Sequence, residues 1–158
     1  MILYHGSNVD IESIDLGRSS VGKDFGCGFY LTASREQAER MGRRRAKLYG
    51  GEMVVSTFEF DENAAREAGL NIKDFGTYSK EWADFVLANR KNDTRTQIHD
   101  FDIVHGPIAN DDVGFQIRRL LAGMITIETF LEELKYKEGI TYQYFFATER
   151  SVQFLKKL

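Results

Sequence analysis

Two short motifs that contain glycine hold the residues best suited to chemistry. The first, LYHGS at residues 3–7, sets His5 beside a glycine, and the second, GCGFYLT at residues 26–32, contains Tyr30. An imidazole can hydrogen-bond a hydroxyl group, and a phenol ring can stack on a flat heterocycle. Glycine lets the backbone of a strand approach a bound molecule closely. Together the two motifs indicate a binding site for a nucleotide.

These motifs resemble the NAD-binding signature of the ADP-ribosyltransferases of the diphtheria-toxin and poly(ADP-ribose)-polymerase type. Those enzymes use a His, a Tyr and a third polar residue on a late strand. Here YQYFF at residues 142–146 supplies Gln143, where many relatives carry Glu. With DFGCGFYLT at 24–32, EW at 81–82 and FDIV at 101–104, the motif order is similar to that of a bacterial domain-of-unknown-function family in that superfamily. The resemblance covers nearly the whole chain.

The resemblance implies a role for each residue of the site. His5 would hydrogen-bond a ribose hydroxyl of NAD, the Gly6 backbone would bind the nicotinamide carboxamide, and Tyr30 would stack on the nicotinamide ring. The residues expected to be catalytic are His5, Tyr30 and Gln143. The residues expected to bind NAD are His5, Gly6, Ser7, Arg18, Gly28, Tyr30 and Thr32.

Gln143 has the largest consequence for the expected chemistry. Its amide can hydrogen-bond the nicotinamide-ribose hydroxyl, but it supplies neither a general base nor the negative charge that Glu would place against an oxocarbenium-like centre. Single transfer of ADP-ribose is therefore favoured over polymer elongation, and Gln143→Glu is expected to raise the rate of nicotinamide release. The nearby carboxylate of Glu149 falls where it would favour a helix N-terminus instead.

The expected function is that of an NAD-dependent mono-ADP-ribosyltransferase, which cleaves the nicotinamide–ribose bond and transfers ADP-ribose to a protein or nucleic acid acceptor. If water attacks instead, the enzyme is an NAD glycohydrolase. If the cleft binds without catalysis, the chain is an inactive nucleotide-binding or protein-interaction module. A toxin role is a further alternative that rests on analogy with compact bacterial domains of this kind.

Several charged groups have two interpretations each. The segment at residues 17–26 is rich in Gly, Ser and charge, is expected to be mobile, and lies where related enzymes carry a loop over NAD. From it, Arg18 is favoured over Lys23 as a partner of the pyrophosphate, because a planar guanidinium suits phosphate. The basic cluster at residues 40–47 is either a solvated helix face, paired with Glu36 and Glu39, or an acceptor surface for RNA, DNA or an acidic protein.

For the remaining reactive side chains, the sequence favours a structural role over a catalytic or metal-binding one. Cys27 could act as a thiol nucleophile with His5, but a small buried Cys is the commoner case. His99 and His105 lack metal-ligand spacing to each other or to Cys27, and no metal is expected. Residues 111–112, both Asp, resemble part of a cation site but also suit a helix N-terminus.

Composition limits the class of protein. The chain has 158 residues, 42% of them hydrophobic, and a net charge of −3, which is too balanced to draw the whole molecule onto a nucleic acid or an anionic membrane. The single cysteine forbids an internal disulfide, and there is neither a signal peptide nor an apolar run long enough to span a membrane. One soluble domain over residues 1–158 is expected, in a reducing, cytoplasmic setting.

The elements that position these motifs mix strands and helices irregularly. Within the second motif, alternation on a strand predicts Phe29 in the core and Tyr30 on the opposite, cleft-facing side. We expect strands at residues 1–4, 28–32, 52–60, 101–104 and 141–147. We expect helices at residues 34–49, 64–68, 79–90, from 111 or 112, 126–139 and 148–155. This pattern predicts an α+β fold, and the resemblance implies two small antiparallel sheets packed around an NAD cleft with helices around them.

Overall fold

A computed structural model describes residues 1–135 and 137–158 of the chain. Its strands are β1 (Ile2–Ser7), β2 (Phe29–Leu31), β3 (Val54–Phe60), β4 (Ile72–Asp74), β5 (Ile103–Pro107), β6 (Tyr142–Phe146) and β7 (Leu155–Lys157). Its helices are the 3-10 helix η1 (Leu16–Arg18), α1 (Arg35–Tyr49), α2 (Glu62–Glu67), α3 (Lys80–Lys91), α4 (Asp111–Leu121), α5 (Ile127–Leu134) and α6 (Glu149–Val152).

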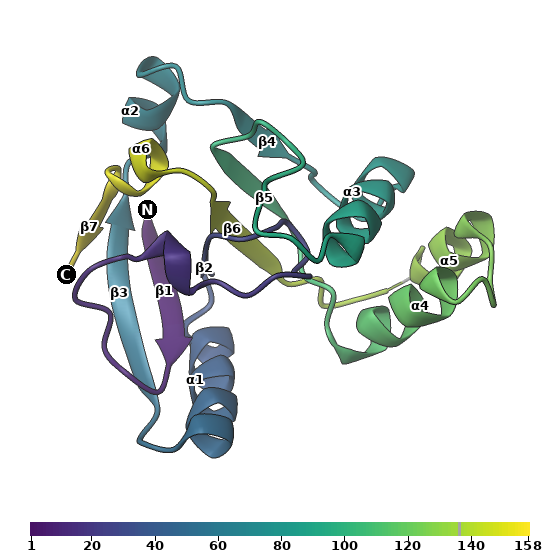
Figure 1. The fold of residues 1–158 in the computed structure, drawn as a ribbon, viewed down its shortest axis with the longest axis horizontal. Coiled ribbons are helices and arrows are strands. Elements are labelled where there is room, and N and C mark those ends of the chain that lie inside the picture. Colours follow the sequence, from purple (N-terminus) through teal and green to yellow (C-terminus); the bar gives the residue numbers. More distant parts are fainter. Residues whose placement is uncertain (136) are drawn as a thin grey trace.

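The strands form two sheets that are joined at one point. One sheet has the order β1-β3-β7 and is antiparallel, and the other has the order β2-β6-β5-β4 (Figure 1). The sheets are joined where Tyr4 and Thr32 exchange backbone hydrogen bonds of 2.8 and 2.9 Å. The expected α+β class with two small sheets is confirmed. The expectation of antiparallel pairing throughout is wrong, because β4 runs parallel to β5.

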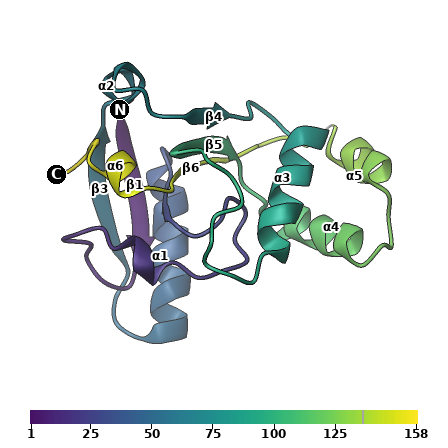
Figure 2. The same ribbon diagram turned by 45° about the horizontal axis from the view of Figure 1, so that its top comes forward.

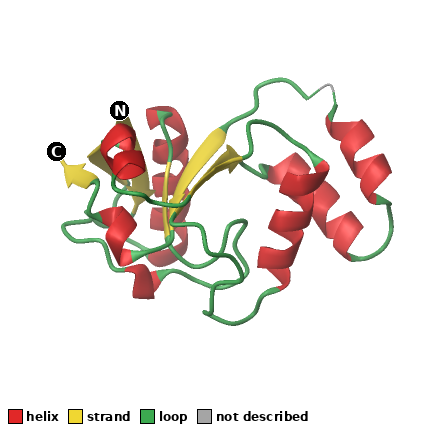
Figure 3. Ribbon diagram, turned by 90° about the horizontal axis from the view of Figure 1, so that it is seen from above, coloured by secondary structure: helices red, strands yellow, loops and turns green. Residues whose placement is uncertain are grey.

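Two hydrophobic cores lie on opposite faces of the second sheet. Adjacent residues of a strand point to opposite faces, so Phe145 and Phe146 of β6 enter different cores. Phe146 packs with Leu3, Phe29 and Phe58 between the two sheets, which confirms Phe29 as a core residue. Phe145 packs in the other core with side chains of α3, α4 and α5. Those three helices lie together at one end of the molecule, beyond the second sheet (Figures 1 and 3).

Polar side chains cap the helices at the positions where the chain turns. Ser34 accepts a hydrogen bond from the backbone of Gln37 at the start of α1, and Gly50, with a φ of 81°, ends that helix as expected. Ser79 caps α3 in the same way, which confirms this predicted helix start. The cap of α4 is Asn110 rather than either following aspartate.

The structure corrects several expected boundaries. The strand expected to stop before Gly106 continues through Pro107, because both residues pair with β6. Proline is tolerated there because β4 pairs only with Ile103–His105. The helix expected at residues 148–155 ends at Val152, and β7 follows. The helix expected to reach residue 139 ends at Leu134, and residue 136 lies outside the described residues. Over the described ranges, no helix combines the length and apolarity that crossing a membrane would require.

Candidate functional site

The candidate site lies where β1 and β2 separate. Antiparallel pairing alternates along a strand, so the backbone of Gly6 points the same way as that of Tyr4, toward β2. In the described chain, however, β1 and β2 pair only at Tyr4 and Thr32. The carbonyl of Tyr30, which would be next in register, is instead 2.8 Å from Nδ1 of His5. Gly6 thus presents its N–H and C=O on the side where the two strands part.

The contacts of His5 fix the proton on one ring nitrogen. A carbonyl only accepts, so Nδ1 of His5 carries the proton and donates to Tyr30. The ring stacks on Phe29, with centroids 4.6 Å apart. Burial lowers the pKa of His5, the hydrogen bond to Tyr30 opposes this, and the charges of Arg45 and Lys23 lower the pKa further. The neutral imidazole therefore keeps Nε2 as an acceptor, and none of the described residues contacts that atom through a hydrogen bond.

Tyr30 is held at both its ring and its hydroxyl. The hydroxyl accepts a hydrogen bond from Phe25 N at 3.0 Å and donates to Gly26 O at 2.8 Å. The ring packs 4.8 Å from that of Phe145, and the Lys23 ammonium lies 5.6 Å from its centroid. Burial raises the pKa of Tyr30 well above its ordinary value, so the hydroxyl remains a donor. Its structural task is to hold the loop that precedes β2.

Gln143 lies on the same face of the second sheet as Tyr30. Tyr30 pairs with Phe145, and Gln143 comes two residues earlier on β6, which makes it a diagonal neighbour of Tyr30 at roughly 7–8 Å. Nε2 of Gln143 is 3.4 Å from Oδ2 of Asp24, and Oδ1 of Asp24 accepts a 2.7 Å bond from Nε of Arg90. Sequence reasoning missed Asp24 and Arg90, because their partners lie far away along the chain.

The loop of residues 19–28, which joins η1 to β2 and overlaps the 17–26 segment expected to be mobile, is held by hydrogen bonds to its backbone. Its backbone carbonyls receive hydrogen bonds from a short segment that follows α3. These bonds are Arg95 Nη1 to Ser19 O at 2.6 Å, Gln97 Nε2 to Cys27 O at 2.7 Å and His99 Nε2 to Phe25 O at 2.8 Å. The loop is therefore held against the second sheet from both sides, by Tyr30 and by this segment.

Packing accounts for the motif glycines in a way that the sequence did not indicate. A Cβ on Gly6 would lie 1.7 Å from Ala38 O, because α1 crosses β1 at this point. A Cβ on Gly28 would lie 2.4 Å from the Phe145 ring. Gly26 has a φ of +103°, a conformation that L side chains rarely adopt. Glycine is thus required at all three positions by the protein's own backbone and rings, whether or not a ligand is bound.

The other residues expected to bind NAD have varied surroundings. Arg18 is 82% exposed and pairs with Asp15 at 3.4 Å, whereas Lys23 lies beside Tyr30. The Thr32 hydroxyl accepts from Ser34 N and lies 3.0 Å from the Gln37 side chain, so it supports the start of α1. Ser7 is buried at the end of β1. Of the two candidates for the pyrophosphate, Lys23 is therefore the one beside the site.

Helix α1 contributes a residue that sequence reasoning had assigned to a surface cluster. Helix α1 lies beside β1 (Figure 2). Ala38 and Gly42 pack against β1, and Arg45 follows Gly42 by three residues, on the same stripe of the helix. The charge of Arg45 lowers the pKa of both His5 and Lys23, although burial is the larger cause for each. Within the described chain, Arg45 forms no ion pair with a carboxylate. Elsewhere in the cluster, the two expected pairs are confirmed: Arg40–Glu36 at 2.8 Å and Arg43–Glu39 at 3.2 Å.

The remaining candidates have partners of their own. The Cys27 thiol contacts Ser20 O at 3.5 Å, and His105 pairs with Asp74 at 3.1 Å. Asp112 pairs with Lys137 at 3.1 Å. The side chain of Asp111 is not among those that the structure describes. Across the described residues, no three His, Cys, Asp or Glu side chains gather as a metal site would require.

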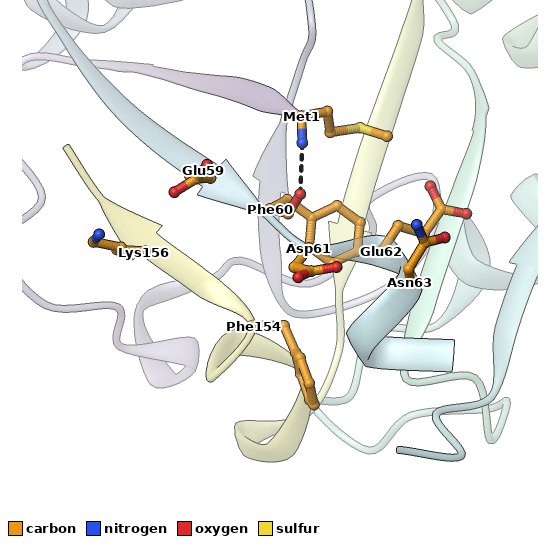
Figure 4. Close-up of a pocket in the computed structure, with 8 residues that line it drawn as sticks. All are labelled: Met1, Glu59, Phe60, Asp61, Glu62, Asn63, Phe154 and Lys156. Atoms are coloured by element: carbon orange, nitrogen blue, oxygen red, sulfur yellow. Dashed lines mark hydrogen bonds between the residues drawn. The ribbon is translucent and has the colours of Figure 1, made fainter. Parts of the chain in front are cut away.

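Two surface depressions lie elsewhere. One, of about 630 Å³, lies beside the N-terminus, where the Met1 amino group donates to Phe60 O at 2.7 Å (Figure 4). It is lined by Met1, Glu59, Phe60, Asp61, Glu62, Asn63, Phe154 and Lys156. The second, of about 330 Å³, is lined by residues of the 12–14 segment, β3, α6 and β7. Neither is lined by His5, Tyr30 or Gln143, and the ring of Tyr30 is instead flanked by Phe25, Phe145 and Lys23.

Comparison with known proteins identifies a family for the chain. No curated protein matches it. The model of a family described as proteins of unknown function, DUF3990, matches residues 1–157. Since this match covers the two glycine motifs, Asp24 and Gln143 alike, the chain belongs to the DUF3990 family.

Proposed function

We propose that this chain binds NAD, cleaves its nicotinamide–ribose bond and transfers ADP-ribose to an acceptor. The proposal rests on the backbone geometry at the point where β1 and β2 separate. There Gly6 offers a backbone N–H and C=O side by side, and a planar carboxamide such as that of nicotinamide needs one acceptor and one donor in this arrangement. Nε2 of the neutral His5 ring is available nearby to accept a hydrogen bond from a ribose hydroxyl.

The charges around His5 favour an anionic ligand. Lys23 and Arg45 lie close enough for each to lower the pKa of His5, and Arg45 also lowers that of Lys23. The charge of Asp24 offsets part of this repulsion at Lys23, and a further negative group beside Arg45 and Lys23 would offset more of it. A pyrophosphate would relieve that repulsion, and it is the part of NAD that joins the two nucleosides.

The proposed reaction needs few reactive side chains. The bond between C1′ of the ribose and the nicotinamide nitrogen breaks, and its electron pair leaves with the neutral nicotinamide. The acceptor then forms a bond to the oxocarbenium-like C1′ and releases its proton to solvent, so nothing is oxidised or reduced. The protein's task is to hold the donor and stabilise the positive centre, for which Tyr30 and Gln143 lie on one sheet face.

The test measures binding and chemistry separately. NAD binding is measured by calorimetry, nicotinamide release by chromatography, and label transfer from adenylate-labelled NAD in a cell lysate. His5→Ala should weaken NAD binding by about 1–3 kcal/mol, the cost of a lost ligand hydrogen bond. His105→Ala is the matched control, since this histidine pairs with Asp74 and should leave binding unchanged.

The outcomes separate the possible functions. Release with transfer supports a transferase, and release without transfer supports a glycohydrolase. Binding without release supports an inactive nucleotide-binding module. A wild-type chain that shows no NAD binding at millimolar concentration, or equal losses for His5→Ala and His105→Ala, would overturn the proposal.

A further inference from the structure

We infer that Asp24 is a positioning residue that orients the side-chain amide of Gln143, so that its carbonyl oxygen is turned toward the nicotinamide ribose. This inference rests on the proposed function and adds to it the residue that gives Gln143 its direction. The two side chains come from the 19–28 loop and from β6, and they are 119 residues apart in the chain.

The chemistry of the two groups decides which end of the amide faces Asp24. A carboxylate oxygen accepts hydrogen bonds, so the amide atom 3.4 Å from Oδ2 of Asp24 must be the NH₂ group of Gln143. Turning the amide by 180° would set oxygen against oxygen. The Oε1 atom of Gln143 is therefore the end directed away from Asp24, and no described residue hydrogen-bonds it.

Arg90 holds Asp24 in this arrangement from the other side. Its Nε donates to Oδ1 of Asp24 at 2.7 Å, which leaves Oδ2 for Gln143. The side chains of Asp24 and Arg90 are only 13% and 22% exposed, so water competes weakly with these bonds. The result is a chain of three groups from α3 to β6, each of which fixes the orientation of the next.

This arrangement reverses the expectation from the sequence for Gln143→Glu. A carboxylate at position 143 would lie against the carboxylate of Asp24, with a separation close to the present 3.4 Å, and like charges repel. The single change would therefore lower the rate of nicotinamide release instead of raising it. Adding Asp24→Asn removes the repulsion, because an amide at position 24 can donate to a carboxylate at position 143.

Asp24→Asn alone should also be harmful, for a different reason. Nε of Arg90 requires an oxygen, so the new amide would turn its oxygen to Arg90 and its NH₂ to Gln143. That NH₂ would attract the oxygen of Gln143, and the amide of Gln143 would present its NH₂ group to the ribose instead. The two single variants thus fail separately, whereas the double variant again pairs a donor with an acceptor: the donor is now at position 24 and the acceptor at position 143, the reverse of the wild-type bond.

The experiment compares nicotinamide release by the full chain in five forms: wild type, Asp24→Asn, Gln143→Glu, the double variant, and Arg95→Ala. The last is the matched control, because Arg95 also ties the loop in place, through Gly17 O and Ser19 O, but does not contact Asp24 or Gln143. We expect kcat to fall about tenfold or more in each single variant, with KM for NAD within about threefold of wild type, and to recover to within about threefold in the double variant. Arg95→Ala should keep the wild-type kcat, and thermal unfolding checks that every form is folded.

Each outcome decides the question. With an active wild type, three results would each overturn the inference while the proposed function stands. Asp24→Asn could keep the wild-type kcat, or Arg95→Ala could lose as much kcat as Asp24→Asn. The third result is a kcat of the double variant no higher than that of the worse single variant. If wild type neither binds NAD nor releases nicotinamide, the proposed function fails and the inference fails with it.

Discussion

Gly6→Ala tests why a glycine stands in the first motif. If its purpose is only to admit a ligand, alanine should affect NAD binding and leave the fold intact. The structure predicts a large loss of stability, because the added Cβ would lie 1.7 Å from Ala38 O, 2.6 Å from Ala38 C and 2.8 Å from Gly42 N. All three are backbone atoms of α1, so no side chain can rotate away.

The size of the effect follows from this geometry. Real Cβ contacts are essentially never shorter than 3.0 Å, so α1 would have to move by more than an ångström from β1. Its contact with β1 includes Gly42, whose own Cβ position lies 3.1 Å from Ser7 O, which leaves little room to slide. Overpacking costs typically 1–3 kcal/mol when side chains can adjust, and for this backbone clash we expect about 3 kcal/mol or more.

Urea unfolding followed by circular dichroism measures the effect. Gly114→Ala in α4 is the control, because its Cβ would lie in ordinary contact, 3.7 Å from Nη1 of Arg118 and 3.9 Å from Ala109 O. It should gain up to about 1 kcal/mol from the better helix propensity of alanine. A loss below about 1 kcal/mol for Gly6→Ala would refute the reasoning. Packing against α1 would then not be what requires the glycine.

Two further predictions concern the 19–28 loop. Tyr30→Phe removes the hydroxyl that bonds Phe25 N and Gly26 O, and should cost about 1–2 kcal/mol in urea unfolding; an unchanged midpoint would show that these bonds do not hold the loop. Nδ1 of His99 accepts from Phe101 N, and burial lowers the pKa of His99 below its ordinary value. The stability that neutral His99 contributes is therefore present above about pH 6.5 and is lost as the pH falls below that value. Thermal unfolding from about pH 7.5 to pH 5 should show a smaller acid loss in His99→Gln than in wild type, and equal losses would contradict the assignment.

Local patterns in the sequence determined the elements that need no distant partner. Ser34 and Ser79 were identifiable as caps because a hydroxyl before a helix satisfies the first free backbone N–H groups wherever that helix packs. Alternation on β2 likewise placed Phe29 in the core. It did not predict that Tyr30, on the opposite face, packs against a second core with Phe25 and Phe145. The two motifs and the late strand could be picked out as a candidate site because polar and aromatic residues beside glycine are uncommon in ordinary strands.

The tertiary structure decided the pairing of strands and the partners of the site residues. β4 (IKD) and β7 (LKK) are short segments with charged residues and no glycine motif or aromatic run to mark them in the sequence, and they exist because neighbouring strands offer them hydrogen bonds. Asp24 meets Arg90 and Gln143 from 66 and 119 residues away. No local sequence pattern predicts such contacts, because they depend on how the 19–28 loop, α3 and β6 pack together. The direction of the Gln143 amide, and with it the chemistry we propose, is therefore set by the tertiary structure.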